Sequence, residues 1–356
     1  MALLGFKVFD ETEDPFRDWG NGWSFTNDAS PGDLSKYYME GRLGRTAFYS
    51  QTTSTNTNHR VHWSAPSGTG LEGVIGFAYN VERAGINNNS RRLMIARAFN
   101  TASNELTAWE LNLDPTTLQF YFEHDATRSE VAIVADSWTF VEVGYRISNT
   151  NGYLRVRVNG VQILELLGDT YRGTGTPDTL ASFGFYAAYS SNYLHHRLQD
   201  IYICDNTGPA PYNTFLGDVT AERLYPDDNG TVSELVGSDG NSIDNYLNVQ
   251  DNSMLTYNES DTPGDRDLYK MSGVSEGAAS VLGVQIQAQG TVDTEGISAV
   301  RTVTSDGVNE TLDPVVGLGI GKTYLLTNIQ TAAPDGTPWT VAKVEAAEYG
   351  VEIVDE

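Results

Sequence analysis

Apolar residues recur at every second position in one segment after another of the first 200 residues. The clearest case is YLRVRVNGVQIL, residues 153–164, where three apolar residues alternate with two arginines before the pair Asn159-Gly160. Alternation with period two places successive side chains on opposite faces of a strand. An Asn-Gly pair supplies the positive φ angles that a type I′ hairpin turn requires. This segment therefore predicts a β-hairpin with one apolar face and one charged face.

The same period appears in several other segments of this half, and no convincing helical period interrupts them. In residues 141–147 four alternate side chains are apolar, while Glu142 and Arg146 are expected to point outward. Many short strands joined by turn residues typically pack as two antiparallel sheets. The sequence therefore predicts an all-β class with an antiparallel β-sandwich of the jelly-roll kind. The other expected strands lie at residues 74–82, 106–113, 118–125, 183–189 and 201–204.

A polar connector is expected to end this first sandwich. Residues 208–213 read GPAPYN, and proline lacks the amide hydrogen that a central strand must donate. We therefore expect three parts: a β-sandwich over 1–207, a connector over 208–213, and a second, acidic β-sandwich over 214–356 that begins with Phe215. Strands of the second part are expected at residues 280–289, 297–307, 323–331 and 351–354.

One short helix is expected near the C-terminus. In TPWTVAKVEAAEYG, Thr337 can cap the helix, Pro338 suits its first turn and Gly350 can end it. Residues 225–275 are rich in Asp, Asn, Ser and Gly, so we expect them to be mainly loop.

The formal net charge of −25 is unevenly distributed along the chain. Residues 1–207 carry 23 acidic and 16 basic residues, whereas residues 208–356 carry 24 acidic and 6 basic ones. Such a surface repels phosphate backbones, so we expect no nucleic-acid partner. No run of 18 apolar residues and no signal peptide is visible, and the single cysteine, Cys204, permits no internal disulfide. We therefore expect no membrane partner and folding in a reducing cytosol.

Sequence motifs for catalysis are not apparent. Glycoside hydrolysis needs two nearby carboxylates, and no strand carries acids at the alternating spacing that would place them together. There is no Gly-x-Ser-x-Gly elbow, and the five histidines do not have the spacing of a zinc site. We therefore expect a protein that is not an enzyme, with no catalytic residues.

Aromatic residues and acidic turns are the candidates for binding. Aromatic planes suit the C–H faces of sugar rings, although core packing competes as an explanation for any one of these residues. Acidic turns can offer oxygen atoms to calcium, and no other cofactor is expected. The candidate glycan-binding residues are Tyr37, Tyr38, Trp63, Tyr189 and Tyr193, and the candidate metal ligands are Asp227, Asp228 and Asp239.

The segments WTFVEVGYRI (138–147), 152–160, FGFY (183–186) and LQDIYICD (198–205) together resemble the concanavalin A-like, laminin-G-type jelly roll. The similarity covers about residues 1–207. The later segments 215–230 and 334–353 resemble uncharacterised structural proteins of tailed bacteriophages and prophages, in which a lectin-like sandwich precedes a second β domain.

This resemblance implies a virion component that is assembled in the host cytoplasm and exposed on the particle. We expect a non-enzymatic structural protein associated with the tail, at a tip, fibre or spike, that also binds a host-surface glycan. The alternatives are a capsid decoration or head-fibre protein and, in a different class, a glycan-active enzyme on the same scaffold. The expected partners are other virion proteins and further copies of the chain, with a trimer favoured by closed symmetry.

Overall fold

A computed structural model gives the structure of the chain, and it describes two units, Met1–Ala221 and Glu222–Glu356. Every ladder between its named strands is antiparallel. Within the described ranges, no helix is both long and apolar enough to cross a membrane. The predicted all-β, antiparallel sandwich class is therefore confirmed. The described residues are 3–7, 23–27, 35–52, 59–82, 92–113, 120–124, 127–131, 133–187, 194–250, 255–292, 299–320 and 323–355.

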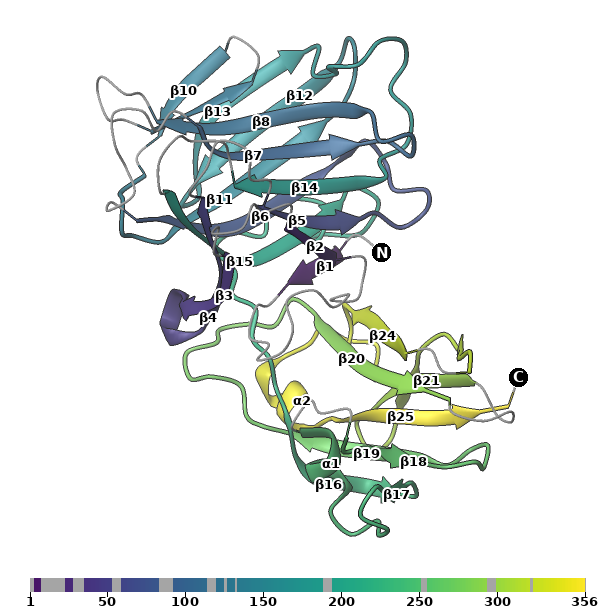
Figure 1. Cartoon of the computed structure of the whole chain (residues 1–356). Helices are drawn as coiled ribbons and strands as arrows, with labels where there is room; N and C mark the ends of the chain where they lie inside the picture. The colour runs from purple at the N-terminus through teal and green to yellow at the C-terminus, as the bar shows by residue number, and fades with distance from the viewer. Residues whose placement is uncertain are drawn as a thin grey trace. The chain divides into compact units, whose positions relative to one another are not determined.

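Two sheets form the first unit (Figure 1). The eight-stranded sheet has the order β13-β12-β11-β6-β15-β4-β3, and β1 also pairs with β15. Its strands are β1 (Leu3–Lys7), β3 (Ser35–Glu40), β4 (Thr46–Thr52), β6 (Glu72–Val81), β11 (Thr139–Arg146), β12 (Gly152–Val158), β13 (Val161–Gly168) and β15 (Leu194–Asp205).

The seven-stranded sheet has the order β10-β9-β8-β7-β14-β5-β2. In Figure 1 its strands β8, β7 and β14 lie in front of β11 and β12 of the other sheet. Its strands are β2 (Trp23–Asn27), β5 (His59–Ser64), β7 (Arg92–Phe99), β8 (Glu105–Leu113), β9 (Phe120–His124), β10 (Thr127–Val131) and β14 (Ser182–Ala187).

The core of the first unit lies between these two sheets, as the alternating pattern predicts. Aromatic pairs join one sheet to the other: Phe77 packs edge-on against Phe185 at 5.3 Å, and Tyr145 packs edge-on against Phe183 at 5.1 Å. Trp109 stacks on Tyr145 with ring centroids 6.4 Å apart. Each of these rings has almost no exposed surface. Because the inner faces are filled, a ligand of this unit must use an outer face or an edge.

The hairpin predicted from Asn159-Gly160 is present between β12 and β13. Val158 pairs with Val161, and the two turn residues have φ angles of 47° and 79°. The Asn159 side chain also accepts a hydrogen bond of 2.9 Å from the amide of Phe140. The turn is therefore tied to β11 as well as to its own strands.

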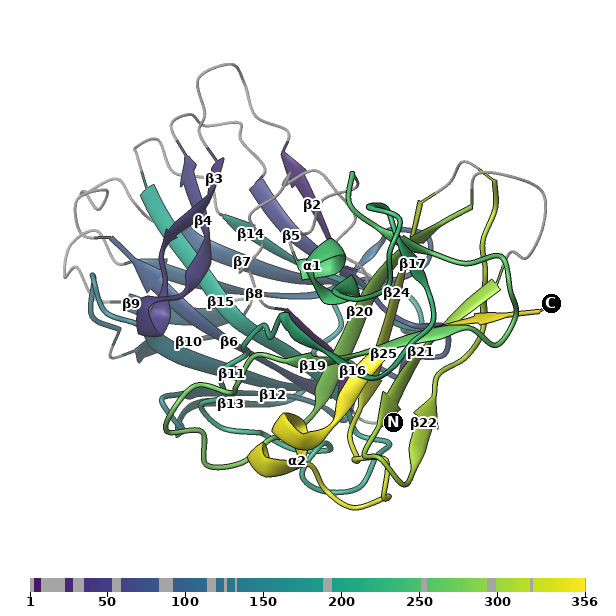
Figure 2. The same ribbon diagram turned by 90° about the horizontal axis from the view of Figure 1, so that it is seen from below.

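The second unit contains one main sheet with the order β16-β19-β25-β21-β22, and β23 also pairs with β21 (Figure 2). Two smaller ladders, β17-β18 and β20-β24, accompany it. Trp339, Val344 and Tyr349 pack with Ile286 in its core. The strands are β16 (Pro226–Ser233), β17 (Val236–Gly237), β18 (Asn258–Glu259), β19 (Arg266–Met271), β20 (Val284–Thr291), β21 (Ala299–Ser305), β22 (Glu310–Leu312), β23 (Val316–Gly317), β24 (Thr323–Gln330) and β25 (Glu348–Val354).

The expected C-terminal helix is shorter than the sequence suggested. Helix α2 spans Val341–Ala346, and its cap is Thr340, whose hydroxyl accepts from the amide of Lys343 at 3.2 Å. Thr337 instead belongs to the preceding turn, and Gly350 lies inside β25. The reason is tertiary: the buried Trp339 indole donates to the carbonyl of Gln330 and holds this turn against β24.

Residues 225–275 are more ordered than the predicted loop. They contain β16, β17, β18 and β19 together with a second short helix, α1 (Asn245–Gln250). Buried hydrogen bonds of Asp267, on β19, join several of these elements. Polar residues therefore hold strands and a helix together in a region where their abundance predicted loops.

The division between the units differs from the expected connector at 208–213. Phe215 was expected to begin the second unit, but it belongs to the first, which extends to Ala221. Its ring lies over Gly144 of β11, where an added Cβ would be 2.8 Å from the ring, and the Arg157 guanidinium stacks above it at 4.0 Å. Residues 208–221 are therefore part of the first unit.

Candidate functional site

The outer face of the eight-stranded sheet is partly covered by the chain itself. Glu142 was expected to point outward and does so, but it is buried beneath residues 215–217. Its carboxylate accepts from the Tyr202 hydroxyl at 2.6 Å and from the amide of Gly217 at 2.8 Å. The Tyr202 hydroxyl in turn accepts from the amide of Leu216 at 3.1 Å. This part of the face is a docking site for the chain's own residues.

A second group of polar contacts holds the end of this segment. Asp200 is almost completely buried and accepts from the amide of Ala221 at 3.0 Å. Arg42 lies 3.5 Å from the same carboxylate, contacts Asp218 at 2.5 Å and donates to the carbonyl of Val219 at 3.2 Å. Burial raises the pKa of Asp200 to about 6, and the positive charge of Arg42 opposes that rise. These contacts hold residues 218–221 where the first unit ends.

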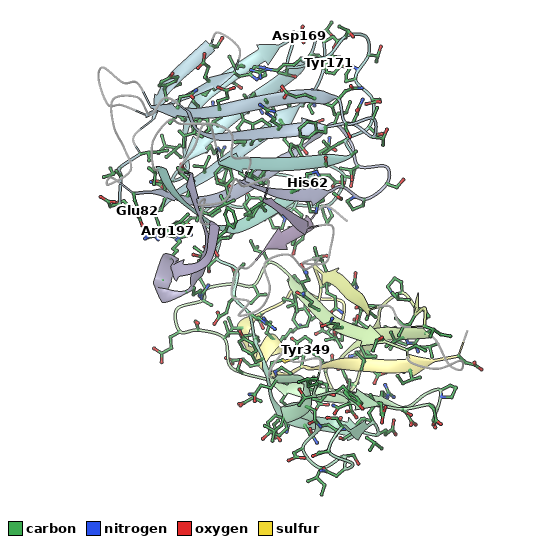
Figure 3. All side chains as sticks on the ribbon, viewed as in Figure 1. His62, Glu82, Asp169, Tyr171, Arg197 and Tyr349 are labelled. Atoms are coloured by element: carbon green, nitrogen blue, oxygen red, sulfur yellow. The ribbon has the colours of Figure 1, made fainter. Side chains whose placement is uncertain are left out.

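The outer face of the seven-stranded sheet carries a row of polar side chains. His62, Gly184 and Arg97 are directly paired neighbours on β5, β14 and β7, so they share one face. That face is the outer one, because Trp63, Phe183 and Ala98, the next residue on each strand, lie in the core. His62 is labelled in Figure 3.

His62 and Arg97 flank Gly184 on this face. The two residues are separated by one strand, which places their backbones about 10 Å apart. Gly184 stands between them and has no side chain, and Ala108 follows Arg97 on β8 with only a methyl group. Arg97 also lies 3.4 Å from the carboxylate of Glu105.

Two carboxylates lie directly opposite each other on the same face. Glu110 of β8 pairs with Glu123 of β9, and the neighbouring pair is Asn112 with Tyr121. Side chains in such cross-strand positions have Cβ atoms about 5 Å apart. The amide of Asn112 donates to a carboxylate oxygen of Glu123 at 3.2 Å. Both glutamates are partly exposed. We call His62, Arg97, Glu110, Asn112, Tyr121 and Glu123 the polar face.

The acid pair corrects the expectation that no suitable pair exists. That expectation rests on acids at alternate positions of a single strand, whereas Glu110 and Glu123 are on neighbouring strands. Core and outer residues alternate in both of these adjacent segments: Trp109 and Leu111 lie in the core on one strand, and Phe122 lies in the core on the other. Aligning the two alternating patterns is the signal that could have predicted the pair. Pairing those segments as a hairpin brings the intervening acids together.

The residues expected to bind glycan from their sequence alone do not form one site in the described part of the chain. Trp63 was wrong as a candidate: it is fully buried and stacks on Phe183 at 6.4 Å, so no sugar can reach its ring. Tyr37 and Tyr38 are on β3, but their side chains lie outside what is described. Tyr189 and Tyr193 lie outside the described residues. Glycan binding by these four tyrosines stays a prediction.

The acidic residues considered for calcium are on the surface of the second unit. Asp228 lies 3.3 Å from the ammonium of Lys270, and Asp227 is its exposed neighbour on β16. Asp239 accepts from the side chain of Asn241 within a turn, at 2.6 Å. Across the described ranges, no three His, Cys, Asp or Glu residues are grouped as metal ligands would be. Calcium binding by Asp227, Asp228 and Asp239 stays a prediction.

Comparison with known proteins gives structural likeness only. No family model and no curated protein matches the sequence. Solved structures of similar fold include alginate lyase Aly36B (9% identity, TM-score 0.36, covering 45% of this chain and 81% of that one). They also include a carbohydrate esterase of the Shiga toxin-encoding bacteriophage phi24B (12%, 0.40, 57% and 97%) and lectin I of Ulex europaeus (13%, 0.35, 53% and 94%).

These solved structures include both a lectin and enzymes. The expectation that the chain is not an enzyme is contradicted, because alginate lyases and a carbohydrate esterase are among the proteins of similar structure. At these identities the likeness concerns the fold.

Proposed function

We propose that the chain binds a glycan on the polar face of its seven-stranded sheet. The observation that carries this proposal is the direct opposition of Glu110 and Glu123, with Asn112 and Tyr121 as the adjacent pair. Carboxylates and amides can bond sugar hydroxyl groups, and an aromatic ring suits the C–H face of a sugar. Glu110, Glu123 and Tyr121 are partly exposed and would make these contacts, whereas Asn112 is buried and holds Glu123.

The acid pair places two hydrogen-bond acceptors side by side on this face. Sugar hydroxyl groups placed between the two carboxylates would donate hydrogen bonds to both. Farther along the same face lie His62 and Arg97, and Arg97 is 3.4 Å from the carboxylate of Glu105.

The proposed setting is the surface of a tailed-bacteriophage particle. Its support is the resemblance of residues 215–230 and 334–353 to phage structural proteins, together with the strongly acidic composition. Tail association is the first choice and capsid decoration the second. In either position a symmetric oligomer, most simply a trimer, would present several polar faces to the same host surface.

Glycan hydrolysis is the second candidate function, and the same acid pair favours it. Glycosidases use two carboxyl groups about 5–10 Å apart, one as the acid and the other as nucleophile or base. The carboxyl groups of two side chains at directly paired positions can lie at the shorter distances of that range. In this case Glu110 and Glu123 are the two carboxyl groups, and Asn112 positions Glu123.

One experiment tests both functions with matched variants. The full chain, Glu110→Gln and Glu123→Gln would be titrated calorimetrically with a panel of neutral and uronic-acid oligosaccharides, and each mixture would be assayed for new reducing ends. Glu165→Gln is the control, because Glu165 is an exposed, ion-paired carboxylate on the other sheet. We expect the two polar-face variants to lose at least about tenfold in affinity, whereas the control keeps it.

The outcomes separate the candidates. Binding without turnover that is lost in both polar-face variants supports glycan binding. Turnover abolished by either substitution establishes the hydrolase. Equal affinity in all four proteins, or no binding to any sugar of the panel, refutes the polar face as a glycan site.

A further inference from the structure

A small lobe of the second unit has a buried polar cluster and several exposed apolar side chains. The lobe consists of residues 235–250 and 255–259, which include β17, α1 and β18. Its two strands pair through Val236 with Glu259 and Gly237 with Asn258. Figure 1 shows α1, β17 and β18 beside β16 and β19.

The interior of the lobe is a hydrogen-bonded cluster of amides and one carboxylate. Asn245 and Asp267 are completely buried, and the Asn245 amide donates to Asp267 at 2.6 Å and to the carbonyl of Leu235 at 2.8 Å. Asp267 also accepts from the amide of Leu235 and from the Tyr269 hydroxyl. Asn258 donates to the carbonyl of Asn245, which ties β18 to α1. Polar bonds therefore hold this lobe together where a protein normally uses apolar packing.

Its outer surface carries large apolar side chains. Ile243, just before α1, is 84% exposed, and Leu247, within α1, is 46% exposed. Asn245 and Asn248, on the other side of α1, are buried. On the strand ladder, Asn258 points inward, so Val236 and Tyr257 point outward, and both are nearly half exposed. The helix and the ladder therefore expose these apolar side chains instead of burying them against the rest of the chain.

The chain segment around these apolar side chains is acidic, and Lys270 of β19 pairs with one of its acids, Asp228, at 3.3 Å. Residues 224–265 contain nine Asp or Glu residues and no Lys, Arg or His. One of them, Glu259, is directly opposite Val236 and shares its face. A second copy of the lobe would bring acidic residues against acidic residues, which opposes self-association at this surface. A surface with apolar groups bordered by basic side chains would complement both the exposed apolar side chains and the negative charge of the lobe.

We propose that this lobe is a docking element for a different protein, one that presents an apolar surface bordered by Lys and Arg. The polar interior keeps the lobe folded before docking, and the exposed Ile243, Leu247, Val236 and Tyr257 supply the apolar contact. The acidic residues steer the approach and select the partner. This inference goes beyond the glycan site, since it concerns the other unit and other residues.

The test uses the full chain and a defined probe. The probe is a fluorescent amphipathic helical peptide with Leu on one face and Lys on the other, and a matched peptide carries Glu in place of Lys. Binding is measured by fluorescence anisotropy at low and high salt for the wild type and for the double variant Ile243→Ser/Leu247→Ser. The control is Val308→Ser, which removes an equally exposed apolar side chain of the same unit, at 89% exposure. Sedimentation of the wild type measures self-association.

We expect the Lys peptide to bind the wild type and Val308→Ser equally, and the double variant to bind about tenfold more weakly. Binding is expected to weaken as salt rises and to be absent with the Glu peptide. Equal binding by all three proteins, or no binding of the Lys peptide, overturns the proposal. Self-association that the double variant abolishes would also overturn it, because a second copy would then cover the surface. Matching melting curves for the three proteins exclude unfolding as the cause of any loss.

Discussion

Removing the charge of Asp200 should stabilise the first unit near neutral pH. Burial raises the pKa of this carboxyl from 3.8 to about 6 in the folded chain. The folded state therefore binds a proton more tightly than the unfolded state, and stability falls as pH rises from about 4 through about 6. One pH unit of difference corresponds to about 1.4 kcal/mol, so the ionised Asp200 costs roughly 3 kcal/mol above that range.

Asparagine is a well-matched replacement at this position. Asp200 has a φ of 52°, in the left-handed region that Asn adopts more readily than most residues. Its side-chain oxygen can still accept from the amide of Ala221. At pH 4 the protonated Asp and the Asn have nearly the same shape and charge. The variant Asp200→Asn should therefore match the wild type at pH 4 and exceed it by roughly 3 kcal/mol at pH 7.5.

Urea unfolding of both proteins at several pH values between 4 and 7.5 measures this difference. Comparing the variant with the wild type at each pH cancels the contribution of the second unit and of the other carboxylates. Asp218→Asn is the control, because Asp218 contacts the same arginine from an exposed position, where an ion pair contributes at most about 1 kcal/mol. A difference between Asp200→Asn and the wild type that stays constant with pH, or a variant less stable at pH 7.5, would refute the reasoning.

Three further substitutions or measurements test the packing. Gly144→Ala should displace Phe215, because the new methyl group would lie 2.8 Å from its ring; faster protease cleavage within residues 208–221 is expected, and unchanged cleavage would contradict the docking of this segment. Asp267→Ala should destabilise the second unit by about 3 kcal/mol or more, because it leaves several buried donors without an acceptor, and thermal unfolding measures this. Cys204 is buried and burial raises its pKa, so a thiol reagent should label it only after denaturation; rapid labelling of the native chain would be the contrary result.

Most of the first unit could be predicted from the sequence, because its strands alternate cleanly. The apolar residues at alternate positions from Ile75 to Val81 and from Leu154 to Val158 are all in the core. The turn also lies at Asn159-Gly160, the pair that most readily adopts the positive φ angles a hairpin turn needs. In these segments the local preference and the tertiary packing favour the same conformation.

The boundary between the units could not be predicted, because it depends on one contact. Pro209 and Pro211 mark a break in the strands, and Phe215 looks like the first core residue of a new unit. Its actual neighbour is Gly144, about 70 positions earlier, whose missing side chain makes room for the ring. Nothing local to residue 215 indicates that partner.

The candidate site was missed for a similar reason. Glu110 and Glu123 each occupy an ordinary outward position on their own strands, and only the register of β8 with β9 brings them together. Trp63, in contrast, was chosen for its chemistry, and its place on the inner face of β5 removes it from consideration. A site assembled across strands requires the sheet order before its residues can be recognised.

The most direct test of the proposed glycan site is a crystal structure of the full chain with the tightest-binding oligosaccharide of the panel. We expect the sugar on the outer face of the seven-stranded sheet, with hydroxyl groups within hydrogen-bonding distance of Glu110 and Glu123 and a ring against Tyr121. A sugar bound to the second unit, to the eight-stranded sheet or at an edge away from β8 and β9 would contradict the account.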